Sequence, residues 1–322
     1  MNPSAPLPRL LADIGGTNAR FAWQEGAGTV PGDLQTLAVA DHASLADAMC
    51  AYLKLIDRPA PPWCAIGVAT PITGDAVSLT NSHWSFSIDA VRHELGFERF
   101  VVINDFTALA LALPDLPAGD LRQLGGGEPV AGTPLGLIGP GTGLGVSGLV
   151  PSTEPGRWAA LQGEGGHVTL AASNAREAAV LQVLHNQFGH ASAERAVSGQ
   201  GLEALHHAIC SVDGLRMATP LAAAEISERA LAGTDPSCVE VLDLFCAFLG
   251  SVAGNLALTL GARGGVYIGG GIVPRLGSAF ESSRFRECFE AKGRFSEYLA
   301  AIPVYVIHAK VSPALLGAAR AL

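Results

Sequence analysis

Lysine is scarce in this chain of 322 residues, since only Lys54, Lys292 and Lys310 stand among its 20 basic residues. None of them lies in a G-x-x-x-x-G-K-S/T pattern, so the sequence excludes a P-loop. Charged residues make up 15% of the chain, and the formal net charge is −9. Affinity for a phosphate backbone depends on clustered Lys and Arg, so we expect no nucleic-acid partner.

Cysteine is also sparse, and no two of the six cysteines have the C-x-x-C spacing of a zinc knuckle or a redox dithiol. Scattered free thiols are typical of a reducing compartment, and the N-terminus shows no secretory signal, so we expect a cytoplasmic protein. Residues 244–262 carry no charge and are long enough to suggest a membrane span. Gly250, Gly254 and Asn255 interrupt this apolar run, which predicts a buried helix and no membrane association.

Glycine, by contrast, is abundant, with 39 residues that follow no three-residue period, which excludes collagen. Many of them form turns next to apolar strands: the patterns at 10–24 and 134–150 each predict a hairpin, and a third strand and glycine turn follow at 265–276. Such turns present backbone N–H groups that can bind phosphate oxygens without lysine, although any single glycine turn is weak evidence. In the second turn Leu144 or Val146 replaces the last glycine of the dinucleotide fingerprint, which disfavours a nicotinamide enzyme.

Apolar strands and helical patterns alternate along the chain, which predicts an α/β fold with a mostly parallel sheet. Ser44 begins one helix, with Asp47 as its capping partner. Crowded proline and glycine at 114–134 predict a domain boundary, helical patterns dominate 174–262, and residues 210–240 are the least recognisable part. The expected strands include 63–70, 100–104 and 303–309, and the expected helices include 44–56, 87–96, 106–113 and 313–322.

Asp105 follows the expected strand 100–104 and opens an apolar helix. One interpretation is structural, because Asp is a favoured N-cap residue. The other is functional, because open α/β sheets bind ligands at the carboxyl ends of their strands. A carboxylate there can accept a proton from an attacking hydroxyl. The sequence leaves both interpretations open.

The motif GEGGH places Glu164 and His167 three residues apart around two glycines. A lone histidine of this kind is usually a satisfied turn residue. No cysteine or second histidine stands near it in the sequence, which argues against a metal site there. A carboxylate and an imidazole can, however, each pair with sugar hydroxyls as acceptor and donor.

Seven motifs occur along nearly the whole chain, namely DIGGTNAR (13–20), ATPITGD (69–75), TNSHWSFS (80–87), INDFTA (103–108), GPGTGLGV (139–146), GEGGH (163–167) and YIGGGIVPR (267–275). Together these motifs resemble those of bacterial glucokinases, sugar kinases of the actin-like and hexokinase superfamily outside the ROK branch. The resemblance covers nearly the whole chain.

The resemblance implies a two-domain α/β protein with the actin-like ATPase (ribonuclease H-like) fold and an inter-domain cleft. We expect a small domain of residues 1–114 plus 309–322 and a large domain of residues 115–308. The implied activity is ATP-dependent phosphorylation of glucose at O6, the first step of glycolysis, with Mg²⁺ as cofactor. A homodimer is expected from the family.

The resemblance also assigns roles to individual residues. Asp105 is implied as the general base for the sugar O6, with Asn104, Glu164, His167 and Glu194 as further sugar ligands. Asp13 is implied as a magnesium ligand, directly or through water. Glu194 is otherwise expected to be an exposed helix glutamate. The implied nucleotide-binding residues are Ala12, Asp13, Ile14, Gly15, Gly16, Thr17, Gly141, Thr142, Gly143, Gly270 and Gly271.

Two alternative functions stay open at the level of sequence. The nearer one is a kinase for another hexose or an amino sugar, because the sugar ligands define a class of hydroxyl pattern more firmly than one substrate. The more distant one is a non-catalytic, sugar-responsive regulator. Such a regulator needs a DNA-binding helix-turn-helix, whereas fewer than ten residues precede the first expected strand and the chain is acidic.

Overall fold

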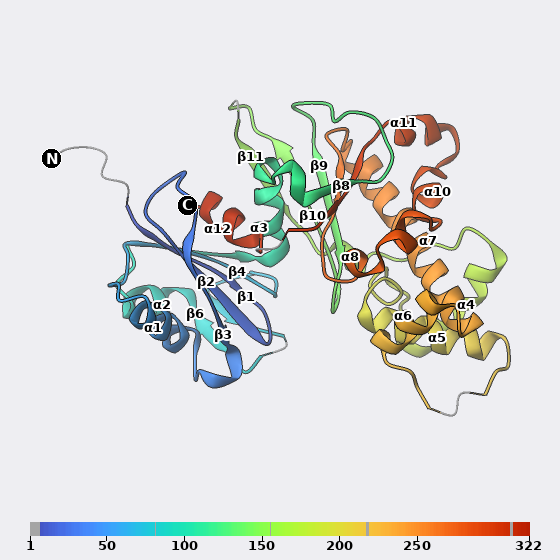
Figure 1. Cartoon of the computed structure of the whole chain (residues 1–322), viewed down its shortest axis with the longest axis horizontal. Coiled ribbons are helices and arrows are strands. Elements are labelled where there is room, and N and C mark those ends of the chain that lie inside the picture. Colours follow the sequence, from blue (N-terminus) through green and yellow to red (C-terminus); the bar gives the residue numbers. More distant parts are fainter. Residues whose placement is uncertain (1–6, 81, 155, 217–218, 310–311) are drawn as a thin grey trace. The chain divides into compact units, whose positions relative to one another are not determined.

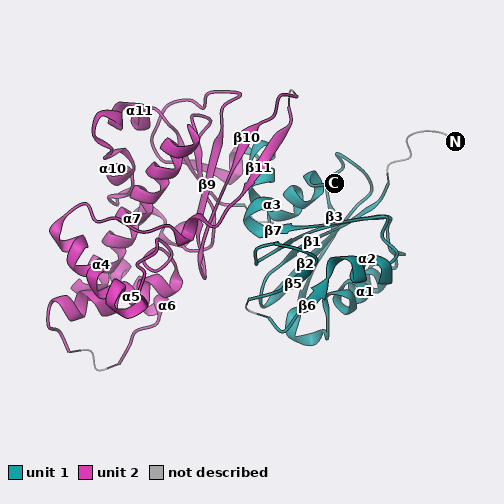
Figure 2. Ribbon diagram, turned by 180° about the vertical axis from the view of Figure 1, so that it is seen from behind, with its two compact units in different colours: residues 1–117, 309–322 teal, residues 118–308 magenta. Residues whose placement is uncertain are grey.

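The computed structural model describes residues 7–80, 82–154, 156–216, 219–309 and 312–322. Asn81 of the TNSHWSFS motif lies outside the described residues. The chain forms two compact units, one of residues Met1–Pro117 with Ala309–Leu322 and one of residues Ala118–His308 (Figure 2). Each unit contains a mixed sheet with helices packed against it (Figure 1).

The first unit is built on a five-stranded sheet of order β3-β2-β1-β4-β7. Its first three strands are antiparallel neighbours, whereas β1, β4 and β7 are parallel. The prediction of a mostly parallel sheet is therefore wrong, because short turns connect β1 to β2 and β2 to β3 and can only join antiparallel strands. The strands are β1 (Arg9–Ile14), β2 (Asn18–Gln24), β3 (Gly32–Ala38), β4 (Trp63–Val68) and β7 (Arg99–Asn104).

Helices cover both faces of this sheet. The first face carries α1 and a core that includes stacked Phe21 and Tyr52, with ring centroids 5.1 Å apart, while Leu11 on the opposite face packs with Leu315. Ser44 caps α1 by accepting a hydrogen bond from the Asp47 N–H, as predicted. The helices are α1 (Leu45–Leu55), α2 (Ile88–Glu94), α3 (Asp105–Ala112) and α12 (Ala314–Arg320), and β5 (Ala76–Ser78) pairs with β6 (Ser85–Ser87).

The second unit has a six-stranded mixed sheet of order β11-β10-β9-β12-β13-β8. The predicted hairpin at 134–150 is present as the antiparallel pair β9 and β10, and β9, β12 and β13 run parallel. The sequence patterns missed the edge strands β8 and β11, which are short and partly exposed. The strands are β8 (Leu121–Gln123), β9 (Leu135–Pro140), β10 (Leu144–Pro151), β11 (Trp158–Gln162), β12 (Val266–Ile268) and β13 (Val304–Ile307).

A layer of helices accompanies this sheet, as the helical patterns over 174–262 predict. The long helices are α4 (Ala175–Phe188), α5 (Gly199–Val212), α6 (Ala223–Ala232) and α7 (Pro236–Leu260), and the short ones are α8 (Val273–Leu276), α9 (Ser278–Glu281), α10 (Phe285–Glu290) and α11 (Ser296–Ala300).

The central helix of this layer, α7, packs against α5, α6 and α10. Among the described residues it is the one helix long and apolar enough to cross a membrane, but 67% of its apolar window is buried inside the unit. Its glycines allow the close packing, since a Cβ on Gly250 would lie 2.1 Å from the Phe285 oxygen and one on Gly254 2.4 Å from the Phe289 oxygen. The predicted buried helix is therefore confirmed.

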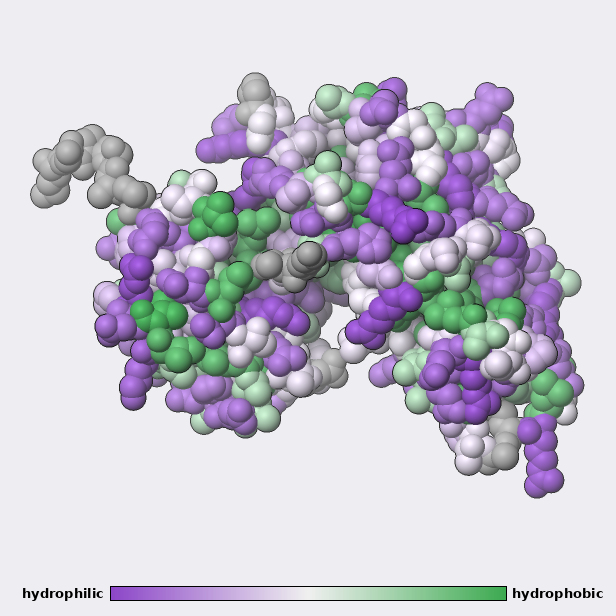
Figure 3. All heavy atoms as spheres, in the orientation of Figure 1, coloured by the Kyte–Doolittle hydropathy of each residue, from purple (hydrophilic) through white to green (hydrophobic). Residues whose placement is uncertain are grey.

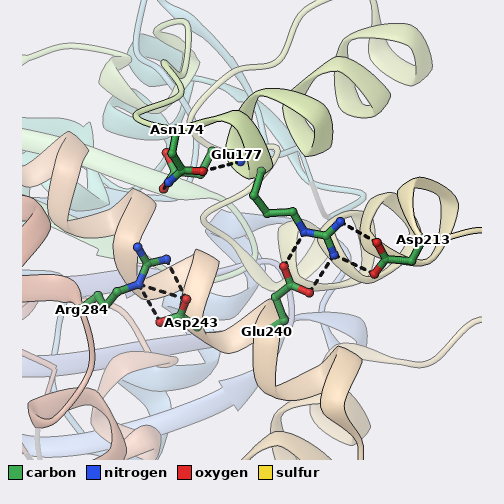
Figure 4. Close-up of polar contacts among 7 residues, drawn as sticks. Asn174, Glu177, Asp213, Glu240, Asp243 and Arg284 are labelled. Atoms are coloured by element: carbon green, nitrogen blue, oxygen red, sulfur yellow. Dashed lines mark hydrogen bonds and ion pairs between the residues drawn. The ribbon is translucent and has the colours of Figure 1, made fainter.

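Ion pairs connect neighbouring helices of this layer (Figure 4). The Arg176 guanidinium near the start of α4 donates to Glu240 of α7 and to Asp213 at the end of α5, at 2.6–2.8 Å. Arg284 donates to Asp243 of α7 at 2.7–3.1 Å. Both arginines make bidentate contacts, which fix the register of neighbouring helices better than a single exposed ion pair.

The surface shown in Figure 3 mixes hydrophilic and apolar residues over both units. Exposed large apolar residues stand singly along the chain, as Val30 and Leu55 do.

The contact between α3 and α12 yields a test of packing. A Cβ on Gly317 of α12 would lie 1.6 Å from the Ala108 oxygen of α3. Because backbone occupies this space, we expect Gly317→Ala to lower the free energy of unfolding by about 1–3 kcal/mol. Urea denaturation followed by circular dichroism measures the change. Gly74→Ala is the control, since a Cβ there meets nothing within 4 Å; equal stability of both variants would contradict the prediction.

Candidate functional site

The turn between β1 and β2 forms the first candidate half-site. The Gly15 N–H donates to the Asn18 oxygen at 2.9 Å, which closes the turn, and the Thr17 side chain is exposed. Ala12 and Ile14 are fully buried, so they can offer a ligand only their backbone. The turn thus presents amides and one hydroxyl to solvent, a set of donors that suits phosphate oxygens.

Asp13 precedes this turn and is held by two partners. Its Oδ2 accepts hydrogen bonds from Ser312 Oγ at 2.7 Å and from Arg20 Nη1 at 3.2 Å. Arg20 is its cross-strand neighbour on β2, whereas Ser312 stands just before α12. Oδ1 accepts no hydrogen bond from any described residue. A carboxylate oxygen of this kind fits Mg²⁺, a hard cation that prefers oxygen ligands.

Asn104 and Asp105 stand where β7 ends and α3 begins. The N-cap residue is Asn104, whose side-chain oxygen accepts from the N–H groups of Phe106 at 2.9 Å and Thr107 at 3.2 Å. The interpretation of Asp105 as the N-cap is therefore wrong, because Asp105 is already the first helical residue. Asn104 caps the helix, and the Asp105 carboxylate accepts one hydrogen bond, from the Phe106 N–H at 2.9 Å.

The electrostatics of Asp105 set it apart from the other carboxylates of this unit. Burial and, to a smaller extent, the negative charge of nearby Asp13 together raise the pKa of Asp105 to about 6, although the hydrogen bond from the Phe106 N–H opposes the shift. Gly67 of β4 allows this crowding, since a Cβ there would lie 3.5 Å from the Asp105 Cα and 3.2 Å from the Ala108 Cβ. A carboxylate with such a pKa is suited to accept a proton near neutral pH.

The second unit brings the glycine turn between β9 and β10 together with Glu194. Glu194 Oε2 accepts from the Leu144 N–H at 2.8 Å, and a Cβ on Gly143 would lie 2.4 Å from the same oxygen. Gly141 is held on both sides, because its N–H donates to Gly143 and its oxygen accepts from the Gly199 N–H, each at 2.8 Å. The carboxylate of Glu194 therefore lies directly against the turn.

The expectation that Glu194 is an exposed helix residue is wrong, because it lies half-buried in a turn that precedes α5. Its N–H donates to the Gly166 oxygen at 2.9 Å. Gly166 in turn packs tightly on the hairpin, since a Cβ there would lie 2.1 Å from the Leu144 oxygen. The structure thus brings the predicted GEGGH segment, Glu194 and the second glycine turn into one place.

Glu164 and His167 belong to the GEGGH segment next to the second glycine turn, and both are exposed. The His167 N–H donates to the Glu164 oxygen at 3.0 Å across the short 3₁₀ turn Gly165–His167. This turn fixes the two backbones close together, and both residues are accessible to solvent.

The third glycine turn lies beside the second. Gly270 has φ +78°, and a Cβ there would lie 2.3 Å from the Pro140 oxygen, so both backbone conformation and space require glycine. Nothing lies within 4 Å of a Cβ built on Gly271, which leaves that position open to a ligand. Arg20, Gly67 and Ser312 are further parts of the candidate site that the sequence patterns did not single out.

Glycine turns can bind phosphate oxygens through their amides, and a carboxylate at a strand end can accept a proton, so these features are compatible with phosphoryl transfer. Solved structures of sugar kinases share the fold. A glucokinase from an Antarctic psychrotroph matches with a TM-score of 0.88 and 39% identity, over 98% of each chain. A ROK family glucokinase from Streptomyces griseus, solved with glucose and AMPPNP, matches with a TM-score of 0.62 at 20% identity, over 98% of each chain. The chain therefore has the two-domain α/β fold of sugar kinases.

Sequence comparison identifies the family within this class. The glucokinase family model matches residues 10–322. The glucokinase of Aromatoleum aromaticum is 60% identical over 99% of this chain and 96% of that protein. The glucokinase of Chromobacterium violaceum is 55% identical over 98% of this chain and 89% of that protein. The chain belongs to the glucokinase family, which confirms the resemblance seen in its motifs.

The raised pKa of Asp105 predicts a dependence of stability on pH. Between pH 3.8 and about 6 the unfolded chain releases this proton while the folded chain keeps it, so the group's contribution to stability falls as pH rises through that window. We expect Asp105→Asn to be more stable than the parent at about pH 7.5, by roughly 1–3 kcal/mol.

Urea denaturation at several pH values measures this difference. The gain should disappear near pH 3.5, where both side chains are neutral, according to the same linkage relation. The control is Asp41→Asn, which changes an exposed aspartate of the same unit. If the difference in stability between Asp105→Asn and the parent does not vary with pH, burial of the charged Asp105 carboxylate is not the cause of that difference.

Proposed function

We propose that this chain transfers the terminal phosphoryl group of ATP to O6 of glucose and releases glucose 6-phosphate and ADP. Membership of the glucokinase family, with relatives up to 60% identical over almost the full length, supports the reaction. The observation that carries the mechanism is Asp105, a crowded carboxylate at the end of β7 with a pKa raised to about 6.

We further propose that residues 1–114 plus 309–322 form the small domain and residues 115–308 the large domain of an actin-like, ribonuclease H-like enzyme. Each half-site described above belongs to one of them. A cleft between the domains would receive both substrates, and its closure would exclude water, which otherwise competes with the sugar as acceptor.

The nucleotide would be held mainly by backbone amides. In this proposal the turn Ala12–Thr17 binds the terminal phosphates from one domain, and Gly141–Gly143 binds them from the other. Gly270 and Gly271 leave room for the nucleoside, as the open space at Gly271 permits. Mg²⁺, held by Asp13 directly or through water, would neutralise charge on the phosphate oxygens.

The sugar would be positioned so that its O6 hydroxyl meets Asp105. The ionised carboxylate takes the O6 proton as the oxygen attacks the terminal phosphorus, and ADP leaves. The side-chain oxygen of Asn104 caps α3 and its Nδ2 donates to the Thr70 oxygen at 3.4 Å, so its second N–H would donate to a neighbouring sugar hydroxyl. Glu164, His167 and Glu194 would complete the sugar site from the other domain.

Glu194 has a second task in this proposal. Because its carboxylate accepts the Leu144 N–H at the end of the phosphate-binding turn, the same side chain that contacts sugar also supports Gly141–Gly143. Sugar and nucleotide sites would therefore share one structural support. The family also leads us to propose a cytoplasmic homodimer.

The test of this function is a coupled assay of ADP release with glucose, mannose, fructose and glucosamine, with and without magnesium. Glucose should give the highest kcat/KM, and omission of magnesium should abolish turnover. Preference for another sugar would favour the alternative of a different hexose or amino-sugar kinase. Failure to release ADP with any sugar would favour the non-catalytic regulator.

The role of Asp105 as base predicts the kinetics of Asp105→Asn. Turnover should fall by about 10²-fold or more, because the amide cannot accept the proton. The KM for glucose should change little, since the amide still forms hydrogen bonds. In the parent enzyme kcat/KM should decline below about pH 6, where Asp105 becomes protonated. Near-normal turnover of the variant would rule out this role.

His167 is predicted to bind sugar and not nucleotide. His167→Ala should therefore raise the KM for glucose about 10-fold or more, the effect of losing a hydrogen bond to a bound ligand, with little change for ATP. His185→Ala, which changes a histidine in the last turn of α4, is the control. An unchanged glucose dependence would remove His167 from the site.

A further inference from the structure

A second cluster of chemically reactive side chains lies in the helical layer, between α5 and the start of α7. Ligand atoms of His206, Asp235 and Cys238 all lie within 4.8 Å of one another. Cys210 adjoins them, with its Sγ 3.9 Å from His206 Nε2. His206, Cys210 and Cys238 are buried. None of these residues takes part in the proposed phosphoryl transfer.

Local structure explains why these side chains meet. His206 and Cys210 are one helical turn apart on α5, so they share a face. Asp235 is the N-cap of α7 and Cys238 lies in its first turn. The Asp235 Oδ1 accepts from the N–H groups of Ser237 at 2.9 Å and Cys238 at 3.4 Å, which leaves Oδ2 free of the cap.

We propose that His206, Asp235, Cys238 and Cys210 form a binding site for Zn²⁺. One imidazole, one carboxylate and two thiols are the donor types that zinc prefers, and four ligands complete its tetrahedron. Zinc bonds of 2.0–2.3 Å place ligand atoms about 3.3–3.8 Å apart. The separations of up to 4.8 Å among His206, Asp235 and Cys238 therefore close with side-chain movements of about 1 Å, and Cys210, whose Sγ lies 3.9 Å from His206 Nε2, would supply the fourth donor. Sulfur donors disfavour Mg²⁺, so this site does not compete for the proposed cofactor.

Burial and the negative charge of Asp235 raise the pKa of the Cys210 and Cys238 thiols, so the bound ion itself has to displace their protons. Burial lowers the pKa of His206, so its imidazole is neutral and has a lone pair to donate. Each thiol loses one proton to solvent as its sulfur binds the ion. Two thiolates and one carboxylate carry three negative charges, one more than the two positive charges of the ion. The guanidinium of Arg229 balances the remaining charge, since its Nη1 lies 3.6 Å from Asp235 Oδ2.

The surroundings also give the ion a way in and a structural effect. His206 lines a cavity of about 400 Å³ in the second unit, whose wall also includes Glu194, Ser198 and Glu203. The bound ion would join α5 to α7. Because α5 begins at Gly199, whose N–H holds Gly141, the ion would also stabilise the support of the second glycine turn.

The experiment uses the full chain, reduced, stripped with a chelator and kept free of nucleotide. Zn²⁺ affinity is measured by competition with a chromophoric chelator, and Co²⁺ serves as a spectroscopic probe. We expect about one ion per chain, a thiolate-to-cobalt charge-transfer band, and a thermal unfolding midpoint several degrees higher with Zn²⁺. Cys238→Ser and His206→Ala should each weaken Zn²⁺ binding by about 100-fold or more, since even indirect partners cost 10–100-fold.

Cys246→Ser is the matched control, because Cys246 is a second buried cysteine on α7 outside the cluster. The Cys246→Ser variant should show the same thiolate-to-cobalt charge-transfer band and the same Zn²⁺ affinity as the parent protein. Circular dichroism of each variant verifies that it is folded. The proposal is overturned if the parent protein binds neither ion, if no thiolate band forms, or if the band persists unchanged in a folded Cys238→Ser variant.

Discussion

Close approach of backbone to backbone is the constraint on which both candidate half-sites depend. Gly166 and Gly270 allow the GEGGH segment and the third glycine turn to press on the β9–β10 hairpin, where a Cβ would lie 2.1–2.3 Å from a carbonyl oxygen. Gly317 does the same between α12 and α3 behind Asp105. The glycines therefore serve two purposes: some expose amides to a ligand, and others remove the side chains that would keep the supporting segments apart.

The close packing of the first unit also brings two carboxylates, Asp13 and Asp105, near each other, which is energetically unfavourable. Asp13 and Asp105 are held near each other, and burial and repulsion disfavour ionisation of Asp105. The fold tolerates this because Asp13 is anchored by Arg20 and Ser312 and because Asn104 takes over the capping of α3. A carboxylate that is unfavourable in its buried place is thus accompanied by neutralising or capping contacts at its neighbours, as the usual trade between stability and function leads us to expect of a functional residue.

Sequence patterns predicted those parts that local chemistry determines. Turn glycines specified the two hairpins, and Ser44 with Asp47 specified the start of α1, because each signal lies within a few residues of the feature. Contacts between distant segments could not be predicted in this way. Glu194 looked like an exposed helix residue, yet its carboxylate meets Leu144, 50 residues earlier in the chain. The cysteines of α5 and α7 lack C-x-x-C spacing, and only packing brings them to His206 and Asp235. The family resemblance supplied the proposed roles that neither spacing nor turn chemistry could assign.

The hydrogen bond between Ser312 and Asp13 joins two residues that are synthesised at very different times. The two residues are 299 positions apart, and the whole second unit is synthesised between them. On a ribosome the five-stranded sheet can emerge early, but the Asp13 carboxylate beside the first glycine turn gains this partner only when residues up to Ser312 have left the exit tunnel. The full set of contacts around Asp13 therefore requires synthesis of the chain through Ser312, and a chain that stopped before Ser312 would lack this hydrogen bond.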